Sequence, residues 1–205
     1  MTQVNLSMSI SADGFVAGPN QSEDNPLGEG GLALHAWHIG DQAEHPVNKQ
    51  VADEMMEGFG AFIMGRNMYG PIRGEWGDTD WKGWWGDDPP YHAPTYVLTH
   101  HAHDPIEMKG GTTFHFVTDG LEAAFAQARE TAGDRKVSIA GGASCAQQAL
   151  AAGLVDELDL QVSPVILGAG ERLLDDFEPG SAPELELERV LEAPGVAHLR
   201  YRVTT

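Results

Sequence analysis

The chain has a single cysteine, no long apolar run and few basic residues. Cys145 has no partner for an internal disulfide, which fits a reducing compartment, and we expect the cytoplasm. No apolar run is long enough to span a membrane, and the first residues lack the basic and apolar regions of a signal peptide. The 31 acidic residues outnumber the 12 Lys and Arg residues, and the net charge of −19 repels nucleic acid and anionic membranes. We therefore expect a small-molecule partner, no nucleic acid and no membrane.

The 205 residues are enough for one domain with a substantial core, and we find no repeat or linker that would divide residues 1–205. Apolar runs and alternating segments predict strands at residues 4–10, 61–64, 95–99, 114–117, 137–140 and 154–160 (extended to 167), and a hairpin over 185–203. Helical spacing predicts helices over residues 46–59, 65–69, 119–133 and 144–153, and long loops fill 21–40 and 74–91. This order predicts an α/β protein with a three-layer α/β/α fold, a mostly parallel central sheet and an antiparallel carboxy-terminal hairpin.

Residues 137–160 form the most informative stretch, because a short apolar strand is followed by two glycines, a helix and an alternating strand. Ser144 and Gln147 have the spacing of a capping box at the start of this helix, and Asp119 and Glu122 repeat the pattern at the preceding helix. Glycines before a helix allow backbone N–H groups to approach an anion. The stretch therefore predicts a phosphate-bearing ligand. The alternative is a simple tight turn, since neither a Rossmann fingerprint nor a P-loop is present.

Three segments together resemble the dihydrofolate-reductase-like superfamily, which includes the reductase domain of bifunctional riboflavin-biosynthesis enzymes. They are SISADGFVAG at residues 9–18, IMGRNMY at 63–69, and IAGGAS at 139–144 followed by GLVDEL at 153–158. Their order and spacing agree over nearly the whole chain. The resemblance implies NADPH binding and hydride transfer to a small heterocyclic or carbonyl substrate, as in 5-amino-6-(5-phosphoribosylamino)uracil reductases or dihydrofolate reductases.

The resemblance also implies which residues bind the cofactor. Arg66 would hold the adenosine 2′-phosphate, because a guanidinium offers paired donors that match a phosphate. Thr99 and His100 would contact the same phosphate. The glycine turn would cradle the pyrophosphate through backbone N–H groups. The full implied set is Ala17, Gly65, Arg66, Asn67, Met68, Thr99, His100, Gly141, Gly142, Ala143 and Ser144.

The implied substrate residues lie on or next to the first strand, on the first long helix and in the second long loop, residues 74–91, which is called the Trp-rich loop below. We expect the nicotinamide and the substrate to lie against the first strand, and hydride transfer itself to belong to the cofactor. Asp13 is the candidate catalytic residue, as a proton donor, with water as the alternative. The expected substrate-binding set is Ser9, Asp13, Val51, Met55 and Trp85.

The sequence departs from the superfamily at two positions that affect specificity. Folate-reducing relatives carry an acidic residue on the first helix, and ungapped counting back from Gly65 places Lys49 there. Asp53, Glu54 or Glu57 would replace it only if the helix shifted, so we expect dihydrofolate to be a poor substrate. Ala143 stands where folate enzymes often carry a basic residue, so the preference for NADPH depends mainly on Arg66, aided by His100.

Two further clusters have more than one interpretation. His100, His101 and His103 suggest a metal site, but adjacent residues at a strand end point to opposite faces, so we expect no metal. The tryptophans of the second long loop either form a small core that holds the loop or make a wall over a flat heterocycle. They are Trp76, Trp81, Trp84 and Trp85.

The carboxy-terminal hairpin has one alternating apolar face and follows a sheet that would otherwise end exposed. Long apolar edges are usually covered or paired, and the resembled reductase domains are dimeric, so we expect a two-fold homodimer. Because a fold does not determine a function, a rival hypothesis stays open. In that hypothesis the chain is a non-catalytic nucleotide-binding protein or sensor on the same scaffold.

Overall fold

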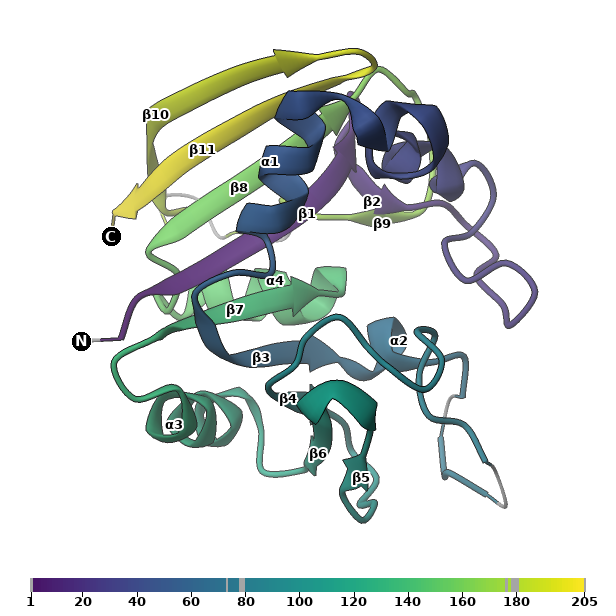
Figure 1. The fold of residues 1–205 in the computed structure, drawn as a ribbon, viewed down its shortest axis with the longest axis vertical. Helices are drawn as coiled ribbons and strands as arrows, with labels where there is room; N and C mark the ends of the chain where they lie inside the picture. Colours follow the sequence, from purple (N-terminus) through teal and green to yellow (C-terminus); the bar gives the residue numbers. More distant parts are fainter. Residues whose placement is uncertain (1, 73, 78–79, 176, 178–180, 205) are drawn as a thin grey trace.

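The computed structural model describes residues 2–72, 74–77, 80–175, 177 and 181–204, and Figure 1 shows the arrangement of the chain. Within these residues a nine-stranded sheet has the order β10-β11-β8-β1-β7-β3-β4-β6-β5. Its strands are β1 (Val4–Ser11), β3 (Phe59–Gly65), β4 (Pro94–Leu98), β5 (Ile106–Glu107), β6 (Thr113–Val117), β7 (Lys136–Gly141), β8 (Glu157–Ser163), β10 (Glu184–Ala193) and β11 (Val196–Thr204). A separate pair consists of β2 (Phe15–Ala17) and β9 (Glu171–Arg172).

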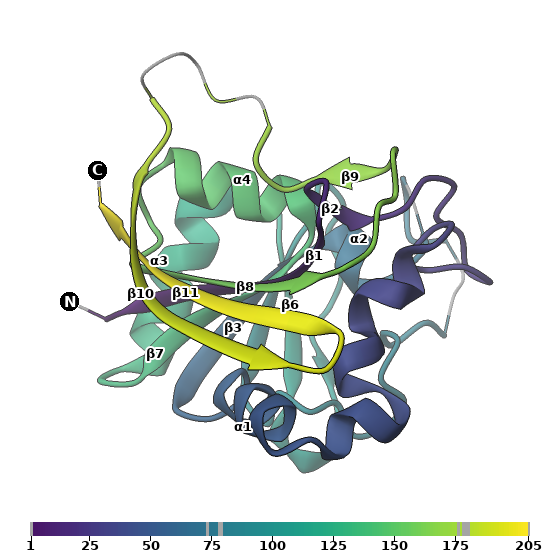
Figure 2. The same cartoon turned by 90° about the horizontal axis from the view of Figure 1, so that it is seen from above.

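The helices lie on both faces of the large sheet. They are α1 (Pro46–Glu54), α2 (Arg66–Tyr69), α3 (Leu121–Ala132) and α4 (Ala143–Ala151), with 3-10 turns η1 (Gly31–His38), η2 (Gly40–Glu44) and η3 (Lys109–Gly111). Figure 2 shows α3 and α4 on one side of the sheet and α1 on the other. The six central strands are parallel, whereas β11 runs antiparallel to β8 and β10. This confirms the predicted three-layer fold with its antiparallel hairpin.

One face of the sheet is an apolar core beneath α3 and α4. The strand residues that face these helices include Leu6, Ile139 and Leu158, which are fully buried. Helix α3 contributes Phe125 and α4 contributes Leu150 to the same cluster. The alternation along β1, β7 and β8 therefore places every second residue in this core.

The opposite face is divided into an apolar half and a polar half. Beneath the Trp-rich loop, β3, β4 and β6 present a second apolar cluster that contains Phe62, Val97 and Phe114. Beneath α1 and η1, the central strands instead present polar residues, all of them buried. These are Asn5, Ser7, Ser9 and Ser11 on β1 and Glu157, Asp159, Gln161 and Ser163 on β8.

Several predicted boundaries were wrong. Helix α1 ends at Glu54, and Phe59 begins β3 instead of extending the helical face, because Gly58, with φ +83°, turns the chain between them. Residues 21–40 are not a plain loop, since η1 lies within them. Strand β8 begins at Glu157 and ends at Ser163, so the predicted extension at both ends does not form.

Neither predicted capping box forms. The helix N-caps are Gly142 and Gly120, and neither helix has a side-chain hydrogen bond at its cap. Ser144 is already inside α4, where its hydroxyl accepts a hydrogen bond from Gln148. The residue pairs have the spacing of a capping box, but each helix starts directly after a glycine, so the glycine and not the predicted residue is the N-cap. No described helix is long and apolar enough to cross a membrane.

Candidate functional site

The candidate site lies where β1 and β7 separate. The two strands pair only at Val4, Asn5 and Leu6 on β1, after which β1 continues to Ser11 alongside β8 alone. Strand β7 meanwhile stays paired with β3. In open α/β sheets, ligands bind outside the carboxyl ends of the strands where neighbouring strands diverge. Three predicted cofactor segments lie at or next to carboxyl ends, because Gly65 ends β3, Thr99 follows β4 and Gly141 ends β7.

Gly141 is restricted to glycine by its surroundings. Its φ is +135°, and an added Cβ would lie 2.9 Å from the Sδ atom of Met68 and 3.3 Å from that of Met8. A side chain here would be strained and would displace both methionines. The turn therefore fits closely between α2, which carries Met68, and β1, which carries Met8.

Gly142 differs, because an added Cβ would point into open space. Its nearest neighbour would be the backbone nitrogen of Met68, 4.0 Å away. Gly142 is the N-cap of the nine-residue helix α4, whose first backbone N–H groups, at Ala143 and Ser144, come before the first helical hydrogen bond. The turn is thus an open cradle in front of a helix N-terminus, where anions bind favourably.

The structure brings Arg66 and Thr99 together, although 33 residues separate them. The Nη1 atom of Arg66 donates a hydrogen bond of 3.2 Å to Oγ1 of Thr99. The guanidinium carbon also lies 3.6 Å from the ring centroid of Trp76, which is a cation–π contact. His100 and Asn67 are exposed beside this pair. Sequence reasoning placed Trp76 only in the Trp-rich loop, and nothing in its spacing indicated Arg66 as its neighbour.

Asp13 holds a loop in place. Its carboxylate accepts hydrogen bonds from the Ser11 hydroxyl at 2.7 Å and from the backbone nitrogens of Leu167 at 3.1 Å and Gly168 at 2.7 Å. These bonds, that of Ser11 foremost, lower the pKa of Asp13 to about 2. In this arrangement Asp13 is a hydrogen-bond acceptor, and its role as the proton donor, with water as the alternative, stays a prediction.

The expected substrate residues fall into two clusters. Ser9 is buried and its hydroxyl accepts a 2.9 Å hydrogen bond from the indole of Trp37, on η1. Val51 is buried against the same Trp37, and Met55 packs at the edge of this group. Trp85 belongs instead to the second apolar cluster, where its ring centroid is 5.1 Å from that of Tyr91. The structure therefore brings Ser9, Val51 and Met55 near one side chain but places Trp85 elsewhere.

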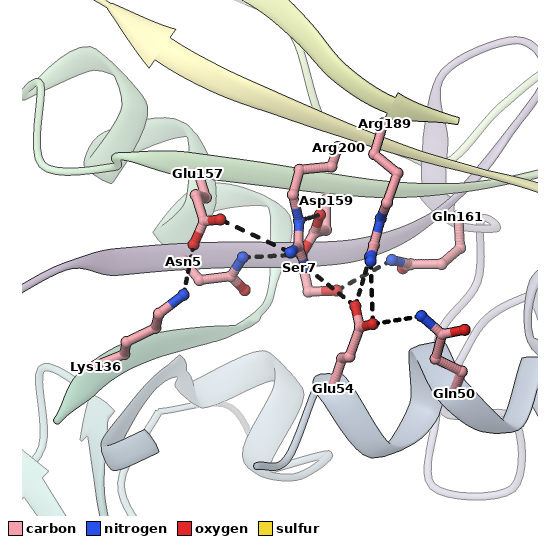
Figure 3. Close-up of polar contacts among 10 residues, drawn as sticks. All are labelled: Asn5, Ser7, Gln50, Glu54, Lys136, Glu157, Asp159, Gln161, Arg189 and Arg200. Carbon is pink, nitrogen blue, oxygen red and sulfur yellow. Dashed lines mark hydrogen bonds and ion pairs between the residues drawn. The ribbon is translucent and has the colours of Figure 1, made fainter. Parts of the chain in front are cut away.

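An ionic network fastens α1 to the polar half of the sheet, as Figure 3 shows. Arg200, on β11, makes a bidentate pair with Asp159, with Nε–Oδ1 and Nη2–Oδ2 distances of 2.7 Å and 2.8 Å. Glu54, on α1, accepts a hydrogen bond of 3.0 Å from Arg189 and lies 3.4 Å from Arg200. Hydrogen bonding to Arg189 is the main reason that the pKa of Glu54 is lowered to about 2. Both carboxylates are thus paired with arginine side chains of the carboxy-terminal hairpin.

The network continues to the amino-terminal ends of the strands. Lys136 on β7 pairs with Glu157 at 2.9 Å, and Asn5 donates a hydrogen bond of 2.9 Å to Asp159. A cavity of about 360 Å³ adjoins these groups and is also lined by Glu57 and Phe59. It lies at the opposite ends of the strands from the glycine turn, so it is separate from the candidate cofactor site.

The histidines after β4 are spread among different partners. His101 lies 3.0 Å from a carboxylate oxygen of Glu75, and the His103 ring packs on Trp76 and Phe116. Within the described residues, no group of three or more His, Cys, Asp or Glu side chains is placed to hold a metal ion.

A mostly parallel sheet with helices on both faces, and an open glycine turn beside an arginine at its carboxyl edge, define an α/β protein of three layers. The chain belongs to the family of RibD C-terminal domains, whose model matches residues 2–199. This confirms the resemblance to riboflavin-biosynthesis reductase domains. No curated protein matches the sequence.

Solved structures show the same fold. A putative riboflavin biosynthesis protein from Shewanella sp. PV-4 superposes with a TM-score of 0.67 at 19% identity, and the match covers 100% of both chains. Acinetobacter baumannii RibD gives 0.63 at 16% identity, where this chain is covered fully and spans 59% of that chain. The Thermotoga maritima diaminohydroxyphosphoribosylaminopyrimidine deaminase/5-amino-6-(5-phosphoribosylamino)uracil reductase gives 0.62 at 17% identity, with 98% of this chain and 56% of that chain covered.

Proposed function

We propose that this protein is an NADPH-dependent reductase that transfers a hydride to a small heterocyclic or carbonyl substrate, similar to 5-amino-6-(5-phosphoribosylamino)uracil. Membership of the RibD C-terminal family supports a reductase of the riboflavin pathway. The observation that carries the proposal is the meeting of two elements at one edge of the sheet. These are the open turn at Gly142 and the Arg66–Thr99 pair.

The residues present fit a dinucleotide with a 2′-phosphate. The space in front of Gly142 admits a group that a Cβ would exclude, and the N–H groups of Ala143 and Ser144 suit a pyrophosphate. Arg66 and Thr99, with His100 beside them, suit the 2′-phosphate. When bound, the nicotinamide supplies the hydride. Asp13 has a positional role in this proposal, because it ties residues 167–168 to the turn after β1, and water is the proton source.

Cofactor preference tests the proposal directly. We expect NADPH to bind more tightly than NADH, and Arg66→Ala to narrow the difference. Loss of a charge-assisted contact to phosphate costs about 1.5–3 kcal/mol, or about 10-fold to more than 100-fold in affinity. Titration of the intrinsic tryptophan fluorescence with each cofactor measures both constants. Equal affinity of the unmodified protein for the two cofactors would overturn the assignment of NADPH.

The substrate is proposed to be a heterocycle other than dihydrofolate. Lys49, at the position of the folate enzymes' acid, is exposed and pairs with Asp53 at 2.8 Å. Glu54 faces the sheet but is held by Arg189 and Arg200. A pterin edge would therefore leave its donors unpaired, which costs specificity and affinity. NADPH oxidation at 340 nm with dihydrofolate and a panel of pyrimidines and small carbonyl compounds tests this, and efficient turnover of dihydrofolate would contradict it.

A specific observation favours the second candidate function, a nucleotide-binding protein or sensor without turnover. The side of β1 that carries Ser9 is closed by Trp37, whose indole donates a hydrogen bond to the Ser9 hydroxyl. Such a protein would bind NADPH with the same dependence on Arg66. It would show no steady-state oxidation with any compound of the panel, whereas the reductase would show it with at least one.

We also propose that the protein forms a two-fold homodimer, and the carboxy-terminal hairpin supports this. Strand β10 ends the sheet, and Leu185, Leu187 and Val190 on one of its faces are 39%, 54% and 55% exposed. The edge itself carries Glu184, Glu186, Glu188 and Glu192. Because edge-to-edge pairing would bring like charges together, we propose that the apolar face packs against a second copy. Light scattering after size exclusion tests the state, and a monomer of about 22 kDa at micromolar concentration would refute the dimer.

The cytoplasm is the proposed location. Cys145 is buried in the core, and burial raises the pKa of its thiol to about 12, so the side chain is an unreactive apolar group. Fractionation of cells that produce the tagged protein tests this, and recovery of the protein outside the cytoplasmic fraction would contradict it.

A further inference from the structure

Trp76 is fixed from several sides. Its indole nitrogen donates a hydrogen bond of 2.9 Å to the backbone oxygen of His101. Its ring centroid lies 5.0 Å from that of Phe116 on β6, 5.1 Å from that of His103 and 6.0 Å from that of Tyr69. The ring is thus anchored to the carboxyl edge of the sheet by groups from α2, from β6 and from the segment after β4.

The fixed ring in turn restrains Arg66. The guanidinium carbon lies 3.6 Å above the ring of Trp76, and Nη1 is bonded to Thr99. A free arginine side chain loses rotamer entropy when it is ordered by a ligand, and this loss weakens binding. With one face stacked and one edge bonded, Arg66 has already lost much of this freedom before any phosphate arrives.

We propose that Trp76 is a positioning residue that holds the Arg66 guanidinium ready for the 2′-phosphate and thereby sets the preference for NADPH over NADH. This rests on the proposed function. Trp76 acts through Arg66, so its removal weakens NADPH binding and leaves NADH binding, which lacks that phosphate, nearly unchanged. Trp76 packs against the same apolar cluster as Trp81 and Trp85, but it is the tryptophan whose ring lies against the Arg66 guanidinium.

The test compares Trp76→Leu, Trp76→Phe and a control, Trp84→Leu, in calorimetric titrations with NADPH and NADH. Trp84 is in the same loop, and its ring contact is to Trp81, 4.5 Å between centroids. We expect Trp76→Leu to weaken NADPH binding about 2- to 30-fold, the range of a cation–π contact, and NADH binding less than twofold. Trp76→Phe keeps an aromatic face and should retain most of the preference. Trp84→Leu should leave the ratio of the two constants unchanged.

A double-mutant cycle with Arg66→Lys provides the second measurement. An ammonium does not present the planar fork that a stacked guanidinium does, so the effects of Trp76→Leu and Arg66→Lys on the ratio should be less than additive. Equal weakening of both cofactors by Trp76→Leu, or full additivity, would overturn this inference alone. A wild-type protein without any preference would overturn the NADPH assignment and this inference with it.

Discussion

The two faces of β1 and β8 are both buried but are built from opposite chemistry. Leu6 and Leu158 face α3 and α4 in a continuous apolar core, whereas Ser7 and Asp159, their neighbours in sequence, face α1 and η1. Strands of parallel sheets that are covered on both sides are usually apolar throughout. Here the alternation resembles that of a strand with one face in water, yet the polar face is covered by a helix.

The polar face is stabilised in a different way from the apolar face. Buried polar groups destabilise a fold unless they are paired, and the charges shown in Figure 3 are paired by Arg200, Arg189 and Lys136. Apolar side chains are stabilised by close packing in any orientation, whereas each buried polar side chain needs a hydrogen-bond or ion-pair partner in a defined position. Helix α1 is therefore attached to the sheet by direction-dependent polar contacts, whereas α3 and α4 are attached by apolar packing.

The largest expected effect is on the apolar face. Leu158→Ala should lower the free energy of unfolding by about 4 kcal/mol, because it removes a fully buried side chain and leaves a cavity. Urea denaturation measures the loss. The matched control on the polar face is Ser7→Ala, which removes one partner of Gln161 and should cost about 1 kcal/mol. If both variants lost the same free energy of unfolding, the proposed difference between the apolar and the polar face would be wrong.

The second effect breaks the ionic network. Arg200→Met should cost about 3 kcal/mol, because it leaves Asp159 as a buried charge without its bidentate partner. Arg200→Met combined with Asp159→Leu should recover part of this loss, since neither partner is then left charged. Denaturant unfolding of the three proteins measures the coupling. A double variant less stable than Arg200→Met alone would contradict this account of the polar face.

The third effect is a dependence on pH that belongs to the polar face. His198 is buried with its Nε2 atom 2.9 Å from Oδ1 of Asn48, and burial lowers its pKa from 6.5 to about 4. The unfolded chain binds a proton at His198 more readily than the folded chain does. The contribution of neutral His198 to the free energy of unfolding is therefore complete above pH 6.5 and is lost as the pH falls toward 4. The loss amounts to at most about 3 kcal/mol. His198→Gln should flatten this part of the stability profile, whereas His100→Gln, at an exposed site, should leave it unchanged.

The smallest effect on stability is expected at the glycine turn between β7 and α4. Gly142→Val should lower the free energy of unfolding by only about 1 kcal/mol, because the added Cβ meets no neighbour and the main loss is that of a good N-cap. The same side chain would fill the space in front of the turn, so it should abolish NADPH binding. Gly141→Val should destabilise the protein more, because φ is +135° and Met68 is only 2.9 Å away. Circular dichroism and cofactor titration separate the two outcomes. A folded Gly142→Val protein that binds NADPH normally would place the phosphates elsewhere.

Much of the fold could be predicted from the sequence, because periodicity is a local property. The strand around Leu6 was predicted from alternation, and those around Ile63 and Ile139 from apolar runs. The glycine turn was predicted from Gly141 and Gly142. Element ends were less predictable, as at Phe59, where a single glycine turn rather than the helical pattern decided the boundary. The short strands β5 and β9 have too few residues for any periodicity to show.

The layered fold, the glycine turn and the arginine that follows β3 could be predicted without the structure, since each depends on residues close together in the sequence. The contacts of Asp13 depend instead on tertiary structure, because its carboxylate accepts a hydrogen bond from a segment 155 residues away. Only the tertiary structure, too, decided that Trp76 lies over Arg66. The physical reason is that a hydrogen bond or a stacking contact depends on what the topology brings within a few ångströms, and sequence spacing carries no record of such distant neighbours.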